Sequence, residues 1–182
     1  MTQFSLFPTS IGHCGIAWRS GVVVATNLPE RSTSVTAARI AERAKASEGQ
    51  PPPEIQYAIE SIGELLEGEK TDLSEIICDF SHIDQFEVGV YVATRDIPPG
   101  ETKTYGDIAV RIGNKRFAQN VGRALGRNPF PIIVPCHRVL GANGKLTGFS
   151  AHGGVSTKLK MLEIEGARFS ESPGLFDNIP PQ

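Results

Sequence analysis

The segment PCHRV, residues 135–139, places a cysteine and a histidine side by side, and these two residue types can together form an activated nucleophile. The reactive species of such a pair is the thiolate, which a neighbouring base or positive charge generates at neutral pH. Because Pro135 disfavours helix in the residue before it, we expect the preceding apolar run to deliver Cys136 on an extended segment rather than inside a helix. A cysteine buried only for packing gives a similar local pattern. The cations His137 and Arg138 favour the reactive alternative.

The geometry of an extended segment limits how the two residues can cooperate. Neighbouring side chains on such a segment point to opposite sides, so a water molecule bridging Cys136 and His137 is more plausible than direct contact. A free thiol is mostly protonated at neutral pH. We therefore expect His137 to serve as the base and to lower the pKa of the thiol.

Length and composition describe a globular chain. Its 182 residues, 40% of them hydrophobic, suit one domain of ordinary size or two small ones. No stretch is as long and apolar as a membrane span, and the amino terminus has no basic start or long apolar core. The three cysteines, Cys14, Cys78 and Cys136, are far apart and odd in number, which predicts reduced thiols. We expect a soluble cytoplasmic protein.

Charge is distributed unevenly along the chain. Residues 1–100 carry 7 Lys and Arg against 14 Asp and Glu, whereas residues 101–168 carry 11 against 4. A basic C-terminal segment predicts that this part alone meets a polyanion such as nucleic acid. A chance partition of charge is the alternative.

The N-terminal half has the pattern of a small α+β unit. Residues 3–28 alternate or run apolar between glycine-containing breaks, which predicts antiparallel strands. Helical spacing of apolar residues predicts helices within 32–46 and 53–68, and residues 74–80 read as a strand. No candidate site is visible in this half. Residues 86–98 are ambiguous, because β-branched residues favour a strand while the spacing of Phe86, Val90, Ala93 and Ile97 fits a helix.

A helix-turn-helix follows. Thr104 is a candidate N-cap for a helix that stops at Gly113, and Asn114 is a candidate N-cap for a second helix that ends at Gly126. The second helix is a natural groove reader. It places the polar residues Lys115, Gln119 and Arg123 at a spacing of four, with Arg116 nearby and with the small residues Ala118 and Gly122 between them. A solvated polar face is the alternative reading.

These motifs carry a resemblance to a known family. PCHRV, preceded by RNPFPIIV and followed by GKLTGFS and LEIEG, resembles the active-site region of the 6-O-alkylguanine-DNA alkyltransferases, also called methylated-DNA-protein-cysteine methyltransferases. The resemblance is close over residues 86–166. It implies an α+β fold with an N-terminal ribonuclease-H-like domain at 1–84, a helical winged-helix-like DNA-binding and active-site domain at 85–168, and a tail at 169–182. It also makes 86–98 a helix, against the local strand reading.

The resemblance implies irreversible, stoichiometric transfer of an alkyl group from the 6-oxygen of guanine to Cys136, without a cofactor or metal. Attack on a saturated carbon asks for a soft nucleophile, and a thiolate is the softest that side chains offer. The implied roles are a base for His137, orientation of His137 by Glu165, a hydrogen bond from Tyr105 to the base, and a tie between helix and active site by Asn128. The implied substrate-binding residues are Val139, Phe149 and Ser150, and the implied DNA-binding residues are Lys115, Arg116, Ala118, Gln119, Gly122, Arg123 and Arg138.

The implied partner is double-stranded DNA that carries an alkylated guanine, bound by a monomer that rotates the nucleotide out of the duplex. Two positions depart from the family pattern. Gln119 stands where the family has an arginine that fills the gap left by the flipped base, and Arg123 and Arg116, one turn away on the same face, are the alternative candidates for this role. Phe149 stands where a tyrosine is usual.

Three other readings compete with this one. Cys136, His137 and Glu165 have the residue types of a cysteine hydrolase. A non-catalytic protein that binds alkylated DNA is possible on the same scaffold. A zinc site from His13, Cys14, Cys78 and His82 matches no standard spacing, so packing explains these four residues better.

Overall fold

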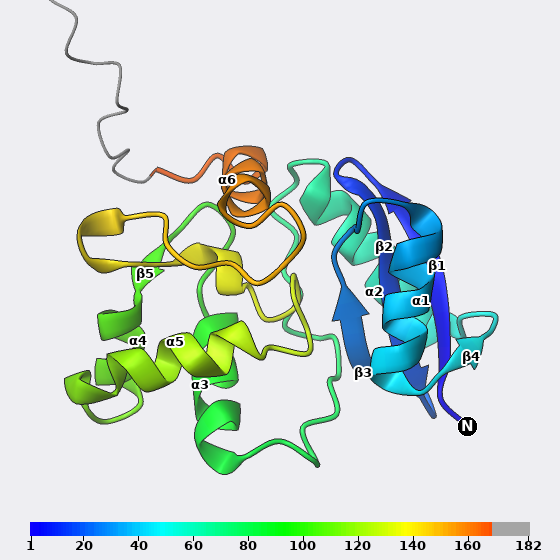
Figure 1. The fold of residues 1–182 in the computed structure, drawn as a ribbon, viewed down its shortest axis with the longest axis horizontal. Helices are drawn as coiled ribbons and strands as arrows, with labels where there is room; N and C mark the ends of the chain where they lie inside the picture. Colours follow the sequence, from blue (N-terminus) through cyan, green and yellow to red (C-terminus); the bar gives the residue numbers. More distant parts are fainter. Residues whose placement is uncertain (169–182) are drawn as a thin grey trace, which may run out of the picture.

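The computed structural model describes residues 1–168, so the tail expected at 169–182 lies outside the described residues. The N-terminal part is a four-stranded sheet with a helix on each face, and the C-terminal part is a group of short helices beside it (Figure 1). The predicted α+β class is confirmed. In the described part of the chain no helix has the length and hydrophobicity needed to cross a membrane.

The sheet begins as the sequence predicts. Strands β1 (Gln3–Thr9), β2 (Gly12–Arg19) and β3 (Val22–Asn27) pair antiparallel in chain order. The two-residue strand β4 (Ser47–Glu48) joins the other side of β1 in parallel, which gives the order β3-β2-β1-β4 and a mixed sheet.

One helix covers each face of this sheet. Helix α1 (Thr33–Ala44) buries Ile40 against Ala17 of β2, while α2 (Pro53–Leu66) buries Ile55 and Ile62 with Trp18 on the opposite face. Neighbouring residues of β2 thus enter different clusters, as the two-residue period of a strand requires. Both predicted helices are confirmed.

The strand predicted at residues 74–80 does not form. Only Cys78 makes a bridge to the sheet, opposite Val23 of β3. The guanidinium of Arg95 binds this segment instead, with Nη2 2.9 Å from each of the carbonyls of Leu73, Ser74 and Ile76, which share its two hydrogens. Carbonyls that a side chain satisfies need no partner strand.

The ambiguous segment is a helix, α3 (Gln85–Arg95), so the local strand reading was wrong. Asp84 caps it by accepting a hydrogen bond from the Phe86 amide at 2.9 Å. Val90 and Ala93 are buried in the core that both halves of the chain share. Burial of this helical stripe outweighs the β-propensity of the individual residues.

The helix-turn-helix forms with one shift in its boundaries. Helix α4 (Tyr105–Arg111) starts in a capping box between Thr104 and Asp107. Asn114 caps a 3-10 turn, η1 (Lys115–Phe117), and α5 (Ala118–Gly126) starts only after it. The second helix is therefore shorter than predicted, and Lys115 and Arg116 lie on the turn that enters it.

The active-site motif also differs from expectation. Residues 136–138 form a single 3-10 turn, η2 (Cys136–Arg138), in which the Arg138 amide donates to the Pro135 carbonyl at 2.8 Å. The extended conformation predicted for Cys136 and His137 is therefore wrong. Extended backbone begins only at β6 (Val139–Leu140), which pairs in parallel with β5 (Lys103–Thr104). A 3-10 turn, η3 (Ala142–Gly144), and helix α6 (Val155–Ile164) complete the described chain.

The N-terminal sheet holds the segment that leads to Cys136. Thr26 of β3 donates its amide to the carbonyl of Pro129 at 2.9 Å and its hydroxyl to that of Pro131 at 2.7 Å. Between this attachment and the cysteine lies Ile132, a buried β-branched residue with a φ of 79°. Such a backbone persists only where its surroundings enforce it.

Candidate active site

Cys136 lies where two cavities adjoin. One, of about 500 Å³, is lined by Tyr105, Gly122, Phe149 and Ser150 among others. The other, of about 490 Å³, reaches from Asn128, Phe149 and Ser150 to charged residues of the N-terminal part (Glu30, Arg39, Glu42 and Arg43). Cys136 keeps part of its surface open to both. A substrate can therefore reach the sulfur.

The surroundings of the thiol favour its protonated form. Burial raises the pKa of Cys136, and a hydrogen bond with Asn128 and the charge of Lys158 offset part of that rise. The predicted lowering by His137 is present as a backbone hydrogen bond, one of several hydrogen bonds that lower this pKa, but burial outweighs them and the net shift is upward. A thiol of this kind needs a base at the moment of reaction.

His137 is backed by a buried carboxylate. Its Nε2 lies 2.8 Å from Oε1 of Glu165, and both side chains are almost fully buried. The guanidinium of Arg138 holds the same carboxylate, with Nε 2.9 Å from Oε2 and Nη2 2.9 Å from Oε1. The Gly100 amide adds a longer contact to Oε2 at 3.3 Å. These hydrogen bonds confirm the predicted proximity of His137 and Glu165.

The charge states follow from these contacts. Burial alone would raise the pKa of Glu165, but the hydrogen bonds and charges of His137 and Arg138 lower it to about 2. Burial lowers the pKa of His137, so its imidazole is neutral. An ionised carboxylate only accepts hydrogen bonds, so we assign the proton of the neutral imidazole to Nε2. Nδ1 then carries a lone pair, and it has no hydrogen-bond partner among residues 1–168.

The prediction that Arg138 contacts DNA is wrong. Its residue surface is 5% exposed, and besides Glu165 it donates from Nη1 to the Ile97 carbonyl at 2.6 Å. A guanidinium committed to these buried acceptors cannot reach a phosphate.

Asn128 joins the end of α5 to the active-site segment, as predicted. Its Nδ2 donates to the Val134 carbonyl and its Oδ1 accepts from the Phe130 amide, both at 2.9 Å. Arg43 of α1 donates to the Asn128 carbonyl at 2.8 Å. No sequence pattern indicates this last contact, because Arg43 precedes Asn128 by 85 positions.

The predicted substrate residues fall into two groups. Tyr105, Phe149 and Ser150 line the cavity beside Cys136, and the Ser150 hydroxyl donates to the Gly126 carbonyl at 3.1 Å. Val139 is fully buried and lines neither cavity. Its carbonyl accepts a hydrogen bond from Lys158 instead.

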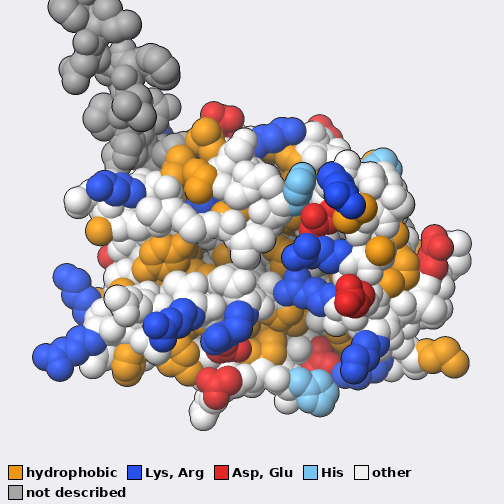
Figure 2. All heavy atoms as spheres, viewed as in Figure 1, with side chains coloured by type: hydrophobic (Ala, Val, Ile, Leu, Met, Phe, Trp, Pro, Cys, Tyr) orange, Lys and Arg blue, Asp and Glu red, His pale blue; other side chains and the backbone are white. Residues whose placement is uncertain are grey.

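The other predicted DNA-binding residues all belong to the helix-turn-helix. Lys115, Arg116, Gln119 and Arg123 are exposed, and Figure 2 shows Lys and Arg side chains gathered over the α4–α5 part of this face. Gly122 faces the pocket, where an added Cβ would come within 3.9 Å of the Tyr105 ring. This helix therefore forms both an exposed basic surface and a wall of the cavity.

Sequence reasoning missed Lys158. It is 0% exposed in α6, and its ammonium donates to the carbonyls of Val139 and Thr147. A signal was present, because Lys158 shares a helical stripe with Met161, Leu162 and Glu165, all buried.

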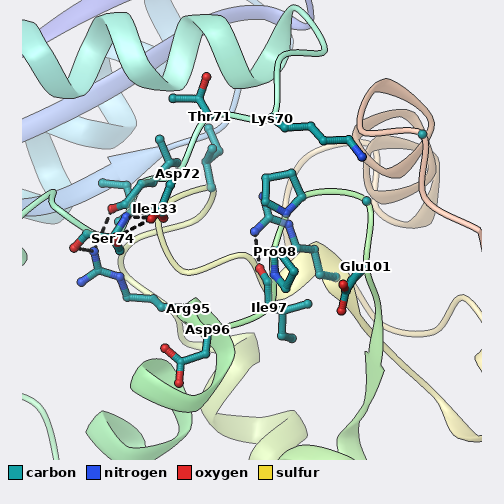
Figure 3. A pocket seen from close by; sticks show the side chains of 16 residues that line it. Lys70, Thr71, Asp72, Ser74, Arg95, Asp96, Ile97, Pro98, Glu101 and Ile133 are labelled. Atoms are coloured by element: carbon teal, nitrogen blue, oxygen red, sulfur yellow. Dashed lines mark hydrogen bonds between the residues drawn. The ribbon is translucent and has the colours of Figure 1, made fainter.

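Another cavity, of about 720 Å³, does not include the cysteine in its lining. Figure 3 shows that residues Lys70 to Ser74 and Arg95 to Glu101 line it, with the Arg95 guanidinium beside Ser74. Arg138 also belongs to its lining. Because the thiol does not reach this cavity, the cavity is no candidate for thiol chemistry.

The zinc reading finds no support. Within residues 1–168 no three His, Cys, Asp or Glu side chains are grouped as metal ligands would be. Cys14 is 1% exposed and packs in the core, while His13, the residue before it, is exposed.

Comparison with known proteins agrees with the geometry. Residues 85–167 match the family described as 6-O-methylguanine DNA methyltransferase, DNA binding domain. A methylated-DNA–protein-cysteine methyltransferase of Mycolicibacterium paratuberculosis is 34% identical over 177 residues, which cover 97% of this chain and 100% of that protein. A relative of the same description from Methanosarcina acetivorans is 52% identical over 83 residues, 46% of this chain and 52% of that protein.

Solved structures extend the likeness to the fold. The crystal structure of the Mycobacterium tuberculosis O6-methylguanine methyltransferase superposes with a TM-score of 0.75 at 33% identity, covering 97% of this chain and all of that one. A structure described as Mycobacterium tuberculosis OGT in complex with DNA gives 0.72 at 33% identity and covers 90% of this chain and 92% of that one.

A mixed sheet joined to a helix-turn-helix domain, with a cysteine open to a cavity beside the second helix, defines a DNA-binding protein that works through a thiol. The chain belongs to the methylated-DNA–protein-cysteine methyltransferase family. It binds DNA and repairs O6-methylguanine by methyl transfer to a cysteine.

Proposed function

We propose that Cys136 is the cysteine that accepts the methyl group. The single observation that carries this assignment is the placement of the three free cysteines. Only Cys136 lines the two adjoining cavities. Cys14 lies in the core and Cys78 packs beside it, and burial raises the pKa of each of these two thiols to about 12.

The proposed reaction is an in-line displacement at the methyl carbon. The Cys136 sulfur forms a bond to that carbon as the bond to the guanine oxygen breaks, and the thiol proton passes to Nδ1 of His137. A bridging water supplies the path for this proton. Glu165 orients the imidazole and stabilises it once it is charged. Tyr105 donates a hydrogen bond, and finally a proton, to the departing guanine, and it regains a proton from solvent while the imidazolium of His137 releases one, so the net change is one proton moved from the thiol to the base.

The thioether that forms is stable, so each molecule reacts once. This outcome separates the proposal from a cysteine hydrolase, which regenerates its thiol, and from a protein that only binds alkylated DNA.

We propose that the substrate is double-stranded DNA carrying an O6-alkylated guanine. The reactive carbon is inside the stack of a duplex, so the nucleotide has to rotate into the cavity of Tyr105, Phe149 and Ser150. The exposed Lys115, Arg116 and Arg123 then neutralise backbone phosphates, and the small Ala118 and Gly122 let α5 approach the groove. Gln119 occupies the gap that the flipped base leaves.

The remaining parts of the proposal concern organisation. One chain supplies every residue used above, which supports a monomer. We place the domain boundary at residue 84, with an active-site domain at 85–168 and a tail at 169–182; the family match over 85–167 supports this division. A thiol acceptor has to stay reduced, which supports a cytoplasmic location.

Intact-mass measurement tests the assignment. Incubation with a duplex that contains one O6-methylguanine should add the mass of one methyl group per protein and then stop. Cys136→Ser should gain nothing, since a hydroxyl is a far poorer nucleophile at neutral pH, and it should still bind the duplex. The matched control Cys78→Ser should gain one methyl group. Methyl uptake by Cys136→Ser, or repeated turnover by the parent protein, would overturn the assignment.

A further inference from the structure

Lys158 is a buried cation without an ionic partner. Its Nζ donates to the carbonyls of Val139 at 2.6 Å and Thr147 at 3.2 Å, and it lies 5.8 Å from the centroid of the Tyr105 ring. None of the ion pairs found within residues 1–168 includes it. Taking an ammonium out of water without a counter-charge is costly, and carbonyl oxygens compensate only part of that cost.

The surrounding groups show which of them can supply the counter-charge. Helix α4 contributes Tyr105, the turn η2 contributes Cys136 and His137, and Arg138 and Glu165 lie behind the imidazole. Arg138 and Glu165 neutralise each other, and His137 is neutral. The two groups that can become negative are therefore the Cys136 thiol and the Tyr105 hydroxyl, and the thiol is intrinsically the more acidic.

The electrostatics point the same way. The pKa of Lys158 is lowered to about 8, because burial lowers it by more than the charge of Cys136 raises it. Lys158 in turn acts to lower the pKa of Cys136 against the effect of burial. Each group thus favours the charged form of the other.

We propose that Lys158 is a positioning residue of the transfer reaction, whose ammonium is the counter-ion of the Cys136 thiolate. The same ammonium ties this charge to the loop ahead of Phe149 and Ser150 through the Thr147 carbonyl, so the nucleophile and the substrate-binding loop share one anchor. The inference rests on the proposed role of Cys136 as the acceptor.

The pH dependence of thiol alkylation tests the proposal. Iodoacetamide reacts with thiolates, so its single-turnover rate at Cys136, followed by mass between pH 5 and 10, reports the midpoint at which the thiol ionises. In Lys158→Met the midpoint should move to higher pH, and the rate well below the midpoint should fall about tenfold for each unit of that movement. Methyl transfer from duplex DNA should fall in parallel at neutral pH. Lys158→Arg should keep the midpoint close to that of the parent.

Lys160→Met is the matched control, because Lys160 is exposed on the same helix. A merely structural role predicts a rate loss in Lys158→Met that is equal at every pH, with an unmoved midpoint, and that result would overturn the inference. If the midpoint does not move but the parent protein is methylated only at Cys136, the proposed function still holds and only the role of Lys158 is refuted. Methylation at another cysteine would instead refute the proposed function itself.

A measurement on the unaltered chain covers the case in which Lys158→Met does not fold. The Lys158 ammonium can be titrated by NMR before and after complete methylation by an O6-methylguanine duplex. A neutral thioether cannot act as a counter-ion, so the pKa of Lys158 should be lower in the methylated protein. Coupling between two titrating groups is reciprocal, so an unchanged titration would contradict the proposal.

Discussion

Replacing Glu165 with glutamine should remove a large part of the protein's sensitivity to acid. The pKa of this carboxyl lies at about 2 in the folded protein against an ordinary value of 4.5. A folded-state pKa that is depressed contributes stability above the ordinary value, and this stability is lost as the pH falls through the folded value. The difference of about 2.5 pH units corresponds to about 3 kcal/mol of unfolding free energy, lost between pH 4.5 and pH 2.

Above pH 4.5, Glu165→Gln should be about 3 to 5 kcal/mol less stable than the parent, because Arg138 remains buried without its counter-charge. The test is therefore the difference between the parent and the variant. Urea unfolding at intervals from pH 6 to pH 2 should show this difference shrinking by about 3 kcal/mol. Other carboxylates, such as Asp72 and Asp79, also have lowered pKa values, and their contribution cancels in the comparison.

The matched control is Glu163→Gln, on the exposed side of the same helix. Its pH curve should run parallel to that of the parent. Parallel curves for Glu165→Gln and the parent would show that His137 and Arg138 do not hold the carboxylate ionised, and the assignment of the lone pair to Nδ1 of His137 would lose its basis.

Three further outcomes are expected. Asn128→Ala should cost about 2 kcal/mol of unfolding free energy by urea denaturation, because it leaves the buried Phe130 amide without an acceptor and removes one of the two hydrogen bonds to the Val134 carbonyl; a loss below 1 kcal/mol would mean that these bonds are replaced. Gln119→Arg should speed repair of duplex DNA without speeding reaction with free O6-alkylguanine, whereas a larger duplex-specific loss in Arg123→Ala than in Gln119→Ala would assign the gap-filling role to Arg123. Alanine at Lys115, Arg116 and Arg123 together should reduce the slope of log affinity against log salt by up to about 3, and an unchanged slope would place the DNA contacts elsewhere.

The elements that local signals specify could be predicted from the sequence. The three antiparallel strands, α1, α2 and the capped start of α4 follow from periodicity and capping residues. Local signals could not predict helix α3, because its β-branched residues favour a strand. Burial of Val90 and Ala93 in the shared core selects the helix instead. The resemblance to a family supplied that helix.

The site shows the same division. The partnership of His137 with Glu165 came from the resemblance, and the structure confirms that the two side chains meet. Arg138 was misplaced because a cation within a basic segment reads as a DNA contact, while its buried acceptors, Glu165 and the Ile97 carbonyl, lie 27 and 41 positions away. Lys158 and Arg43 were missed for a related reason. The helical stripe of α6 indicates that Lys158 is buried, but no pattern of residue types reveals that Lys158 and Arg43 bond to backbone carbonyls.

The attachment of the active-site segment to β3 has a further consequence for the N-terminal sheet. β3 is an edge strand, and an uncovered edge invites pairing with another chain. Residues 77–79 cover the edge at Val23, and Pro129 covers it at Thr26. The same contacts that position the cysteine therefore protect the sheet from self-association. Residues 1–84 produced alone would lose the Pro129 contact, leaving that part of the edge open to aggregation.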